Sequence, residues 1–382
     1  MPGLLPNVDP DGLLEFSVVY TDRSLNHMSE EFKKVMVDIS SVLKDAYNAH
    51  SAVIVPGSGT FGMEAVARQF ANQKKCLVLR NGWFSYRWTQ IFDLANITQD
   101  ISVLKGKQLD VSTQGVFAPA PIEEVVAFIK KEKPEVVFAP HVETSAGIIL
   151  PNDYLKAVGE AVRSVNGLFV LDCIASGAMW VDMKACDVDV LITAPQKGWS
   201  SSPCCALIAL GERARERIES TQSSSFSMDL KKWLQIMEAY EKGGHVYHTT
   251  MPTDALKILR NTMKETQTLG FDALRERQQE LGDKVRKLLV AKGYPSVSAK
   301  GFQAPGVVVS YPRDTDIQSG KKFIALGLQT AAGVPLQCDE RPDFRTFRIG
   351  LFGLEKLAHV DRTVDLLAKA LENITEVEAQ AA

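Results

Sequence analysis

Short apolar runs alternate with amphipathic segments over the first two thirds of the chain. Apolar runs of this length, bounded by polar residues, are typical of buried parallel strands. They predict strands at 52–55, 76–79, 136–139, 168–171, 188–193 and 204–210. Apolar residues three and four apart predict helices at 30–47, 63–70, 121–131 and 153–165. This alternation predicts an α/β fold, with a mostly parallel central sheet and helices on both faces.

The pattern changes near residue 270, which suggests a division of the chain. Residues 1–29 are rich in proline and read as an irregular segment, and residues 30–270 hold the alternating strands and helices of a large domain. Residues 271–382 predict a smaller α+β domain. Its elements are a long charged helix at 271–292, a strand at 306–310, a helix at 316–326, a strand at 347–350 and a closing helix at 360–374.

Two of the apolar runs are followed by side chains suited to chemistry. Asp172 directly follows the run at 168–171, and Lys197 comes shortly after the run at 188–193. Ligands of open α/β sheets bind beyond the carboxyl ends of the strands, so we expect these two residues to face one crevice. A lysine that holds an aldehyde as a Schiff base, and an acid that keeps a pyridine nitrogen protonated, are what pyridoxal phosphate (PLP) requires. Taken alone, the two residues are also compatible with a second interpretation, in which Asp172 is an acid at a strand end, Lys197 is a surface lysine, and the two form no site.

The strength of that pairing follows from elementary electrostatics. Two unit charges about 4 Å apart attract by roughly 4 kcal/mol at an effective dielectric near 20. That energy corresponds to about three pKa units in favour of the charged ring nitrogen. A carboxylate at this place would therefore keep a bound pyridine ring protonated.

Residues 57–62 form a glycine-rich loop between the strand at 52–55 and a helix. The free N–H groups and the dipole of such a helix start bind anions. Gly57, Gly59 and Gly62 also match the G-x-G-x-x-G pattern of dinucleotide sites. That motif needs an acid about 20 residues further on, whereas the strand at 76–79 ends in Arg80. An NADP-dependent oxidoreductase that uses Arg80 stays open, but it leaves the acid and the amine described above without a role.

Two further loops follow predicted strands. Residues 81–87 are crowded with aromatic side chains, and one ring could cover the face of a planar cofactor or anchor the core. Residues 140–147 include His141 and Glu143. Because no metal ligands accompany these two residues, we expect them to have structural roles.

Composition narrows the class of protein. The 382 residues are 45% hydrophobic and 23% charged, as in soluble globular proteins. The net charge of −3 gives no electrostatic case for nucleic acid or for an anionic membrane. No apolar run reaches membrane-spanning length, and the first residues lack a signal peptide pattern. The six cysteines form neither a disulfide framework nor a spaced metal site, so we expect a cytoplasmic protein.

Taken in order, these features resemble the class V aminotransferases of PLP fold type I. The chain is most similar to the alanine–glyoxylate and serine–pyruvate branch, over residues 28–375, and most specifically at 57–60, 195–197 and 347–350. The resemblance implies that Lys197 holds the cofactor, that Asp172 pairs with its ring nitrogen, and that Arg348 grips the substrate carboxylate. It also implies cofactor contacts from Ser58, Gly59, Thr60 and Gln196 at the phosphate, from Phe84 and Ser145 at the ring, and from Tyr247 and Thr250 of a neighbouring subunit.

The implied activity is a transamination between a small amino acid of the alanine or serine type and a small 2-oxo acid of the glyoxylate or pyruvate type. The cofactor contacts from a neighbouring subunit imply an obligate homodimer, with segment 1–29 near the active site. The segment Glu15–Tyr20 stands where the family has a Gly/Pro-rich opening. Alternatives are a PLP-dependent lyase or desulfurase that uses the Cys338 thiol, an aminophosphonate donor, and a non-catalytic scaffold.

Overall fold

The computed structural model describes the backbone of residues 13–381 and the side chains of residues 13–374. The first twelve residues of the predicted irregular segment therefore lie outside the described part. From residue 13 to the start of helix α1 (Glu30–Tyr47) the chain has neither helix nor strand. Ser29 caps α1, because its side chain accepts a hydrogen bond from the Phe32 backbone N–H at 3.1 Å.

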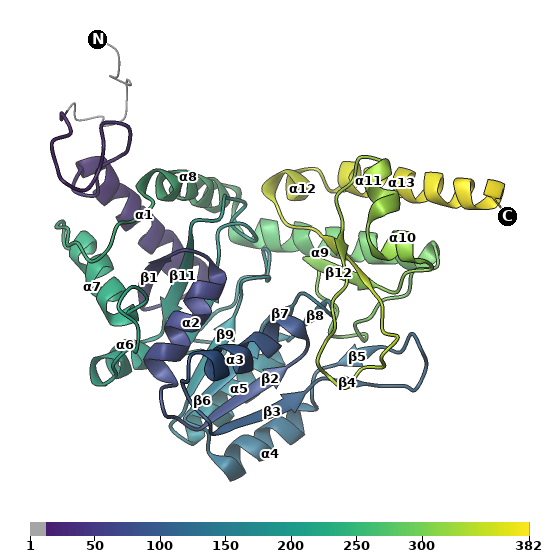
Figure 1. The fold of residues 1–382 in the computed structure, drawn as a ribbon, viewed down its shortest axis with the longest axis horizontal. Coiled ribbons are helices and arrows are strands. Elements are labelled where there is room, and N and C mark those ends of the chain that lie inside the picture. Colours follow the sequence, from purple (N-terminus) through teal and green to yellow (C-terminus); the bar gives the residue numbers. More distant parts are fainter. Residues whose placement is uncertain (1–12, 382) are drawn as a thin grey trace.

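A seven-stranded sheet forms the centre of the larger body (Figure 1). Its order is β1-β11-β10-β9-β6-β2-β3. The strands are β1 (Ser51–Pro56), β2 (Cys76–Arg80), β3 (Ile101–Lys105), β6 (Val136–Pro140), β9 (Leu168–Asp172), β10 (Val190–Thr193) and β11 (Cys205–Leu210). Strand β11 runs antiparallel to β1 and β10, and the other pairs are parallel. Every strand except β11 therefore points the same way, and their carboxyl ends meet at one edge.

The predicted mostly parallel sheet is thus confirmed, with one strand that the apolar runs did not indicate. Strand β3 lies at the edge of the sheet, and all of its residues are only partly buried. The strands predicted from apolar runs are instead almost completely buried. An edge strand covered less fully needs no continuous apolar run, which explains why the pattern missed it.

Helices cover both faces of this sheet. The helices between its strands are α2 (Gly59–Phe70), α3 (Trp83–Leu94), α4 (Ile122–Glu132) and α5 (Asn152–Ser164). Crossovers between parallel strands are right-handed, so α3, which leads outward from β2 to β3, lies on one face, and α4 and α5, which lead back, lie on the other. Helix α2 packs against α3, and α5 packs against α4.

After β11 the chain forms α6 (Glu212–Arg217), a short 3-10 helix (Ile218–Ser220), α7 (Leu230–Glu241) and α8 (Thr253–Leu269). Helix α7 packs against β1, and α1 packs against both α7 and α8. Two short hairpins complete the larger body, β4 (Lys107–Gln108) with β5 (Phe117–Ala118), and β7 (Val142–Glu143) with β8 (Ile148–Ile149).

The C-terminal part begins at α9 (Phe271–Ala291), which starts directly after Gly270 and packs against β12 (Figure 1). It contains an antiparallel sheet in the order β12-β14-β13, made of β12 (Val307–Ser310), β13 (Ala331–Ala332) and β14 (Phe347–Gly350). Helices α12 (Leu354–Ala358) and α13 (Val360–Ala381) close the chain. That residues 30–270 and 271–382 are separate domains stays a prediction.

One helix was predicted wrongly. Residues 316–326 form two short helices, α10 (Thr315–Gln318) and α11 (Lys321–Ala325). Gly320 separates them with a φ of 79°, a left-handed conformation that interrupts a right-handed helix.

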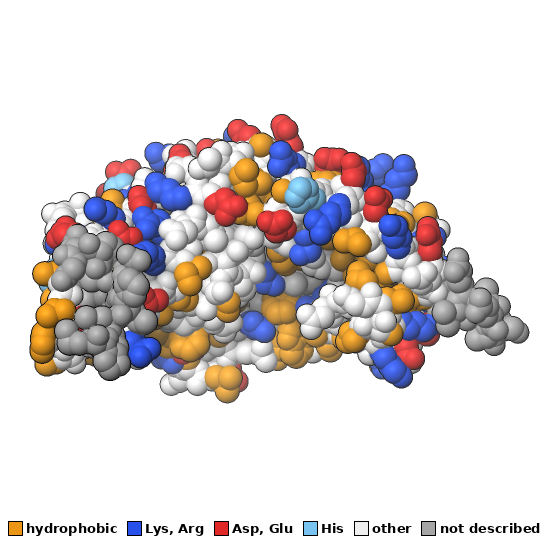
Figure 2. Space-filling view, turned by 90° about the horizontal axis from the view of Figure 1, so that it is seen from above, with side chains coloured by type: hydrophobic (Ala, Val, Ile, Leu, Met, Phe, Trp, Pro, Cys, Tyr) orange, Lys and Arg blue, Asp and Glu red, His pale blue; other side chains and the backbone are white. Residues whose placement is uncertain are grey.

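The surface mixes both signs of charge. On the face shown in Figure 2, Lys and Arg side chains lie among Asp and Glu side chains, and the upper rim carries both. Among the described helices, none combines the length and the apolar character needed to cross a membrane.

Candidate active site

A cavity of about 220 Å³ lies at the edge where the carboxyl ends of the strands meet. The loops after β1, β2, β6, β9 and β10 all contribute to its wall. Its lining includes the predicted residues Ser58, Gly59, Thr60, Phe84, Asp172, Gln196 and Lys197, together with Met63, Arg87, Val142, Thr144, Ile174 and Ala175. The parallel sheet thus brings together groups that are far apart in the sequence, as predicted for the acid and the amine.

The glycine loop brings the start of α2 against this cavity. Gly57 has a φ of 125°, which a side chain would strain, so it forms the turn out of β1. A Cβ at Gly59 would lie 2.6 Å from Cδ1 of Ile174, so glycine lets the helix start approach the residues after β9 closely. The first N–H groups of a helix have no acceptor inside it. The Ser58 side chain makes no capping bond to them, so these groups can bind an anion.

Arg80, the residue that kept the NADP alternative open, is engaged inside the protein. Its guanidinium donates to Oγ1 of Thr89 at 3.1 Å and stacks over the Tyr86 ring, 4.7 Å from the ring centroid. Only 9% of Arg80 is exposed. The side chain therefore has no free face for the phosphate of NADP.

Asp172 ends β9 as an almost buried acid at the floor of the cavity. Burial raises the pKa of its carboxyl group to about 7, and the buried Glu143 adds to this effect. The backbone N–H of Ile174 donates to the carboxylate at 2.9 Å and works against the rise. Among the described side chains, no cation forms an ion pair with Asp172 within 4.0 Å. A cationic ligand atom beside Asp172 would therefore favour the ionised carboxylate.

Lys197 follows β10 and is half-buried. Its Nζ atom lies 4.8 Å from the centroid of the Phe352 ring, a cation–π distance. Burial lowers the pKa of the amine, and the positive charges of Arg348 and Arg87 lower it further, while Asp172 opposes them. A lowered pKa leaves more of the amine neutral, and the neutral amine is the form that attacks a carbonyl or accepts a proton.

Glu143 supports the cavity from behind as a fully buried carboxylate. Its oxygens accept hydrogen bonds from the backbone N–H groups of Phe84 at 3.2 Å, Ser85 at 2.9 Å and Ser145 at 3.1 Å. The hydroxyl groups of Ser85 and Ser145 donate to it as well, both at 2.7 Å. Glu143 thus caps the start of α3 and fixes the backbone of Phe84, which agrees with the expected structural role.

Ser145 belongs to this buried network. Its hydroxyl donates to Glu143 and accepts a hydrogen bond from the Trp83 backbone N–H at 2.9 Å. Within this loop, the hydroxyl-bearing residue that lines the cavity is the neighbour of Ser145, Thr144. Of the two adjacent aromatic residues, Phe84 lines the cavity, whereas the ring of Trp83 packs on Tyr86 with 5.6 Å between centroids.

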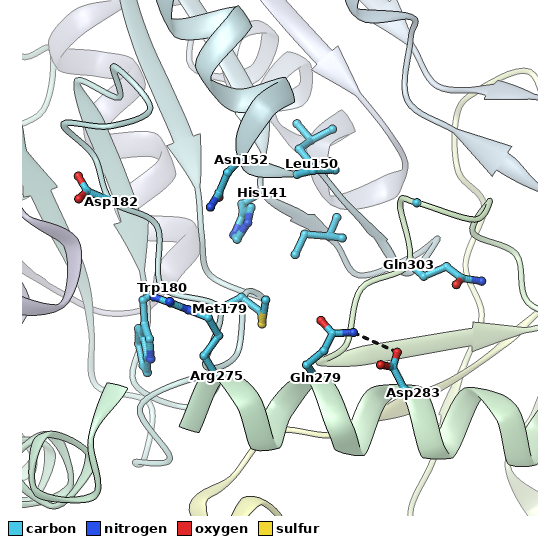
Figure 3. A pocket seen from close by; sticks show the side chains of 13 residues that line it. His141, Leu150, Asn152, Met179, Trp180, Asp182, Arg275, Gln279, Asp283 and Gln303 are labelled. Atoms are coloured by element: carbon cyan, nitrogen blue, oxygen red, sulfur yellow. Dashed lines mark hydrogen bonds between the residues drawn. The ribbon is translucent and has the colours of Figure 1, made fainter. Parts of the chain in front are cut away.

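His141 lines a second, larger hollow of about 640 Å³, which is separate from the cavity that holds Lys197 and Asp172 (Figure 3). That hollow lies between α9 and the loop after β9, and neither Lys197 nor Asp172 lines it. Nδ1 of His141 is 2.7 Å from Oγ of Ser176, and burial lowers the pKa of the imidazole to about 3. A neutral, hydrogen-bonded histidine fits the expected structural role.

Arg348 stands beside the cavity on β14, in the C-terminal part of the chain. Its Nε atom donates to the Ala332 carbonyl at 2.9 Å, and its guanidinium carbon lies 5.7 Å from the centroid of the Phe84 ring. Tyr247 and Thr250 lie elsewhere, on an exposed loop after α7, where their hydroxyl groups are 3.0 Å apart. The cavity lining of the same chain includes neither of them.

The sequence reading missed several neighbours of the cavity. Among them are Arg87 and Thr144, which line the cavity, and Phe352, whose ring faces the Lys197 amine. Arg87 could have been found, because it lies three residues after Phe84 on the same helix, and such residues share a face. Phe352 had no comparable signal, since the fold of the C-terminal part brings it to Lys197.

Cys338, the thiol required by the desulfurase alternative, is buried. Its Sγ atom donates to the Arg80 carbonyl at 3.3 Å. Burial raises the pKa of the thiol to about 12, and the nearby Glu143 and Glu340 raise it as well. A thiol in this environment supplies no thiolate to accept sulfur.

Comparisons with known proteins identify the family. Residues 14–309 match the family Aminotransferase class-V. The chain is 27% identical to alanine–glyoxylate aminotransferase 1 of Saccharomyces cerevisiae over 384 residues, which cover 91% of this chain and 92% of the relative. It is 25% identical to a protein named soluble hydrogenase, small subunit, of Synechococcus over 355 residues, which cover 92% of this chain and 86% of that protein.

Among solved structures, alanine–glyoxylate aminotransferase from Nostoc matches with a TM-score of 0.75 and 20% identity, covering 90% of this chain and 88% of that one. At this identity the match shows the fold, and it confirms the predicted PLP fold type I. The family match covers well over half of the 382 residues. The chain therefore belongs to the class V aminotransferase family, as the sequence resemblance indicated.

Proposed function

We propose that this protein is a PLP-dependent transaminase that moves an amino group between a small amino acid of the alanine or serine type and a small 2-oxo acid of the glyoxylate or pyruvate type. One observation carries the proposal: Lys197 and Asp172 line the same cavity as the anion-binding start of α2. The relatives support the substrate class, since they include alanine–glyoxylate aminotransferase from yeast.

Class V aminotransferases depend on PLP, and the residues of this chain fit that cofactor. The cavity offers unpaired N–H groups for a phosphate at one end, and a buried acid without a cationic partner at the other. Between them lie an aromatic ring, Phe84, and the Lys197 amine. When bound, PLP supplies an electron sink that stabilises negative charge at the substrate Cα atom.

Each residue then has a separate task. Asp172 would face the ring nitrogen and stabilise its positive charge, and this interaction in turn would keep the carboxylate ionised. Lys197 would hold the cofactor and, once released by the incoming amino group, would take the proton from the substrate Cα at its Nζ atom and pass it to the cofactor. Arg348 would orient the substrate by gripping both oxygens of its carboxylate with its planar guanidinium.

The same reasoning supports a homodimer. Tyr247 and Thr250 are exposed, and their hydroxyl groups point to each other outside the cavity of their own chain. They would reach a cofactor phosphate only in a second copy of the chain, as the family resemblance implies. The described part of segment 1–29 lies beside this loop, with the His27 ring 5.6 Å from the Tyr247 ring. We propose that both segments complete the site of the partner subunit.

A cytoplasmic location is also part of the proposal. All six cysteines of the chain are free and buried, although Cys204 and Cys205 bring their sulfur atoms within 3.8 Å. Unpaired cysteines are typical of proteins from a reducing compartment.

The visible spectrum of the purified protein tests the function. The wild type should absorb in the visible range as PLP-bound protein, lose that band when L-alanine donates its amino group, and recover it when glyoxylate is added. Lys197→Ala should lose the band and essentially all turnover, because no other described lysine lines the cavity. Retained transamination in that variant would contradict the proposed role of Lys197. A panel of donors that includes serine, glycine and an aminophosphonate would then define the substrate.

A further inference from the structure

Arg87 is a positive charge in the cavity to which neither the sequence reading nor the family resemblance gives a task. It lies on α3, and its side chain lines the cavity together with Thr60, Phe84 and Lys197. Among the described residues, Arg87 forms no ion pair within 4.0 Å. Taking the proposed function as its basis, we propose that Arg87 is the cation that binds the phosphate group of PLP.

The geometry places the guanidinium at the phosphate end of the cavity. One of its terminal nitrogens donates to Oγ1 of Thr60 at 3.3 Å, and Thr60 belongs to the first turn of α2. The guanidinium carbon also lies 4.7 Å from the centroid of the Phe84 ring, a cation–π distance. Arg87 therefore reaches from α3 to the start of α2, where the free N–H groups point.

Phe84, three residues before Arg87 on α3, holds the Arg87 side chain in place. The backbone of Phe84 is fixed by the buried Glu143 carboxylate. The ring of Phe84 in turn supports the guanidinium group of Arg87 by direct contact. An arginine oriented in this way loses less side-chain freedom when it binds an anion than a side chain that extends freely into solvent.

Charge balance gives an independent reason. The phosphate contacts implied by the family resemblance are the side chains or backbone of Ser58, Gly59, Thr60, Gln196, Tyr247 and Thr250, and all of them are neutral. A phosphate monoester carries about 1.5 to 2 negative charges at neutral pH. A helix start offers only about half a positive charge. Arg87 supplies the missing charge at the place where the helix start lies.

Two arginines contact the same ring from different elements, and this separation suggests a division of labour. Arg87 comes from α3 and contacts Thr60, whereas Arg348 comes from β14 and contacts the Ala332 carbonyl. Their guanidinium carbons lie 4.7 Å and 5.7 Å from the Phe84 centroid. One guanidinium group in the cavity lining and a second one beside the cavity are suited to two anions: the cofactor phosphate at Arg87 and the substrate carboxylate at Arg348.

The test compares PLP with pyridoxal, which has the same aldehyde and ring but no phosphate. The dissociation constant of each is measured by titrating the cofactor-free full-length protein and following protein fluorescence. Arg87→Gln should weaken PLP binding by about ten- to hundredfold, the range expected for a lost hydrogen bond to a charged group, and leave pyridoxal binding unchanged. Arg87→Lys should recover part of the loss, because a lysine keeps the charge but not the planar fork.

Two matched controls use other arginines of the chain. Arg68 lies on α2, outside the lining of the cavity, and pairs with Glu64 at 2.7 Å, so Arg68→Gln should leave the affinity for PLP unchanged. Arg348→Gln should raise the KM for the amino acid and leave the affinity for PLP within about threefold of the wild type, because screening weakens charges that do not touch the ligand.

The possible results separate the alternatives. Equal weakening of PLP and pyridoxal in Arg87→Gln would mean that Arg87 only supports the fold of the cavity, and would overturn the inference. Unchanged PLP affinity with a raised KM for an acidic substrate would overturn it as well, in favour of a contact to a second substrate carboxylate. A wild-type protein that binds neither aldehyde would remove the proposed function itself.

Discussion

The buried carboxylate of Glu143 offers a quantitative test of how the site is held. Glu143→Gln keeps the shape of the side chain but replaces one acceptor oxygen with an NH₂ group. One carboxylate oxygen accepts from two backbone N–H groups, of Phe84 and Ser145, and the other accepts from one, of Ser85. The best placement of the amide therefore sets its NH₂ group against the N–H of Ser85, and these two donors cannot pair.

The cost follows from the number of groups left without a partner. A buried donor without an acceptor costs about 1–3 kcal/mol. The lost negative charge at the start of α3 removes about 0.3–2 kcal/mol more. We therefore expect Glu143→Gln to lower the free energy of unfolding by about 2–4 kcal/mol. At about 2.1 cal/mol/K of unfolding entropy per residue, this corresponds to roughly 2–5 °C in Tm for a chain of 382 residues.

Chemical denaturation of the cofactor-free protein measures this loss, with Glu123→Gln as the matched control. Glu123 is an exposed acid in the first turn of α4, so its replacement should change stability by less than about 0.5 kcal/mol. The Glu143 variant should also bind PLP more weakly, because the backbone of Phe84 loses its anchor. If both variants unfold at the same urea concentration, the buried carboxylate does not hold α3 in the way described.

Three further predictions concern single residues. Because burial raises the pKa of Asp172 from 3.8 to about 7, the folded cofactor-free protein binds more protons than the unfolded chain between these pH values. As the pH rises through this range, its free energy of unfolding should therefore fall by up to about 1.4 kcal/mol per pH unit. Urea titrations of Asp172→Asn should lack that slope. Cys338→Ser should retain transaminase turnover; its loss in a folded variant would revive a role for the thiol. Gly62→Ala should cost about 1–3 kcal/mol in the same unfolding assay, because the new Cβ overlaps the Cβ of Ala206, whereas Gly244→Ala, with its nearest neighbour at 3.5 Å, should cost little.

Local patterns were sufficient for most of the larger body. Continuous apolar runs predicted all the strands of the seven-stranded sheet except β3, because strands buried on both faces need apolar residues at every position. The acid at the end of one run and the amine beyond another predicted a shared crevice, because parallel strands end at the same edge. The helix predicted from apolar spacing at residues 316–326 was wrong, because a single left-handed glycine interrupts an otherwise helical pattern.

The sequence by itself therefore determined the fold class, through the periodicity of its apolar residues, and the family, through the resemblance of its motifs. It also predicted that Asp172 and Lys197 share one cavity, because both residues follow parallel strands. Only the tertiary structure decided that Thr144 rather than Ser145 lines the cavity, that Phe352 faces the amine, and that Arg87 reaches Thr60. The contacts of Phe352 and Arg87 join residues that are distant along the chain, and Thr144 and Ser145 are neighbours in one turn. Side-chain direction in turns and contacts between distant elements depend on packing, which the local sequence does not encode.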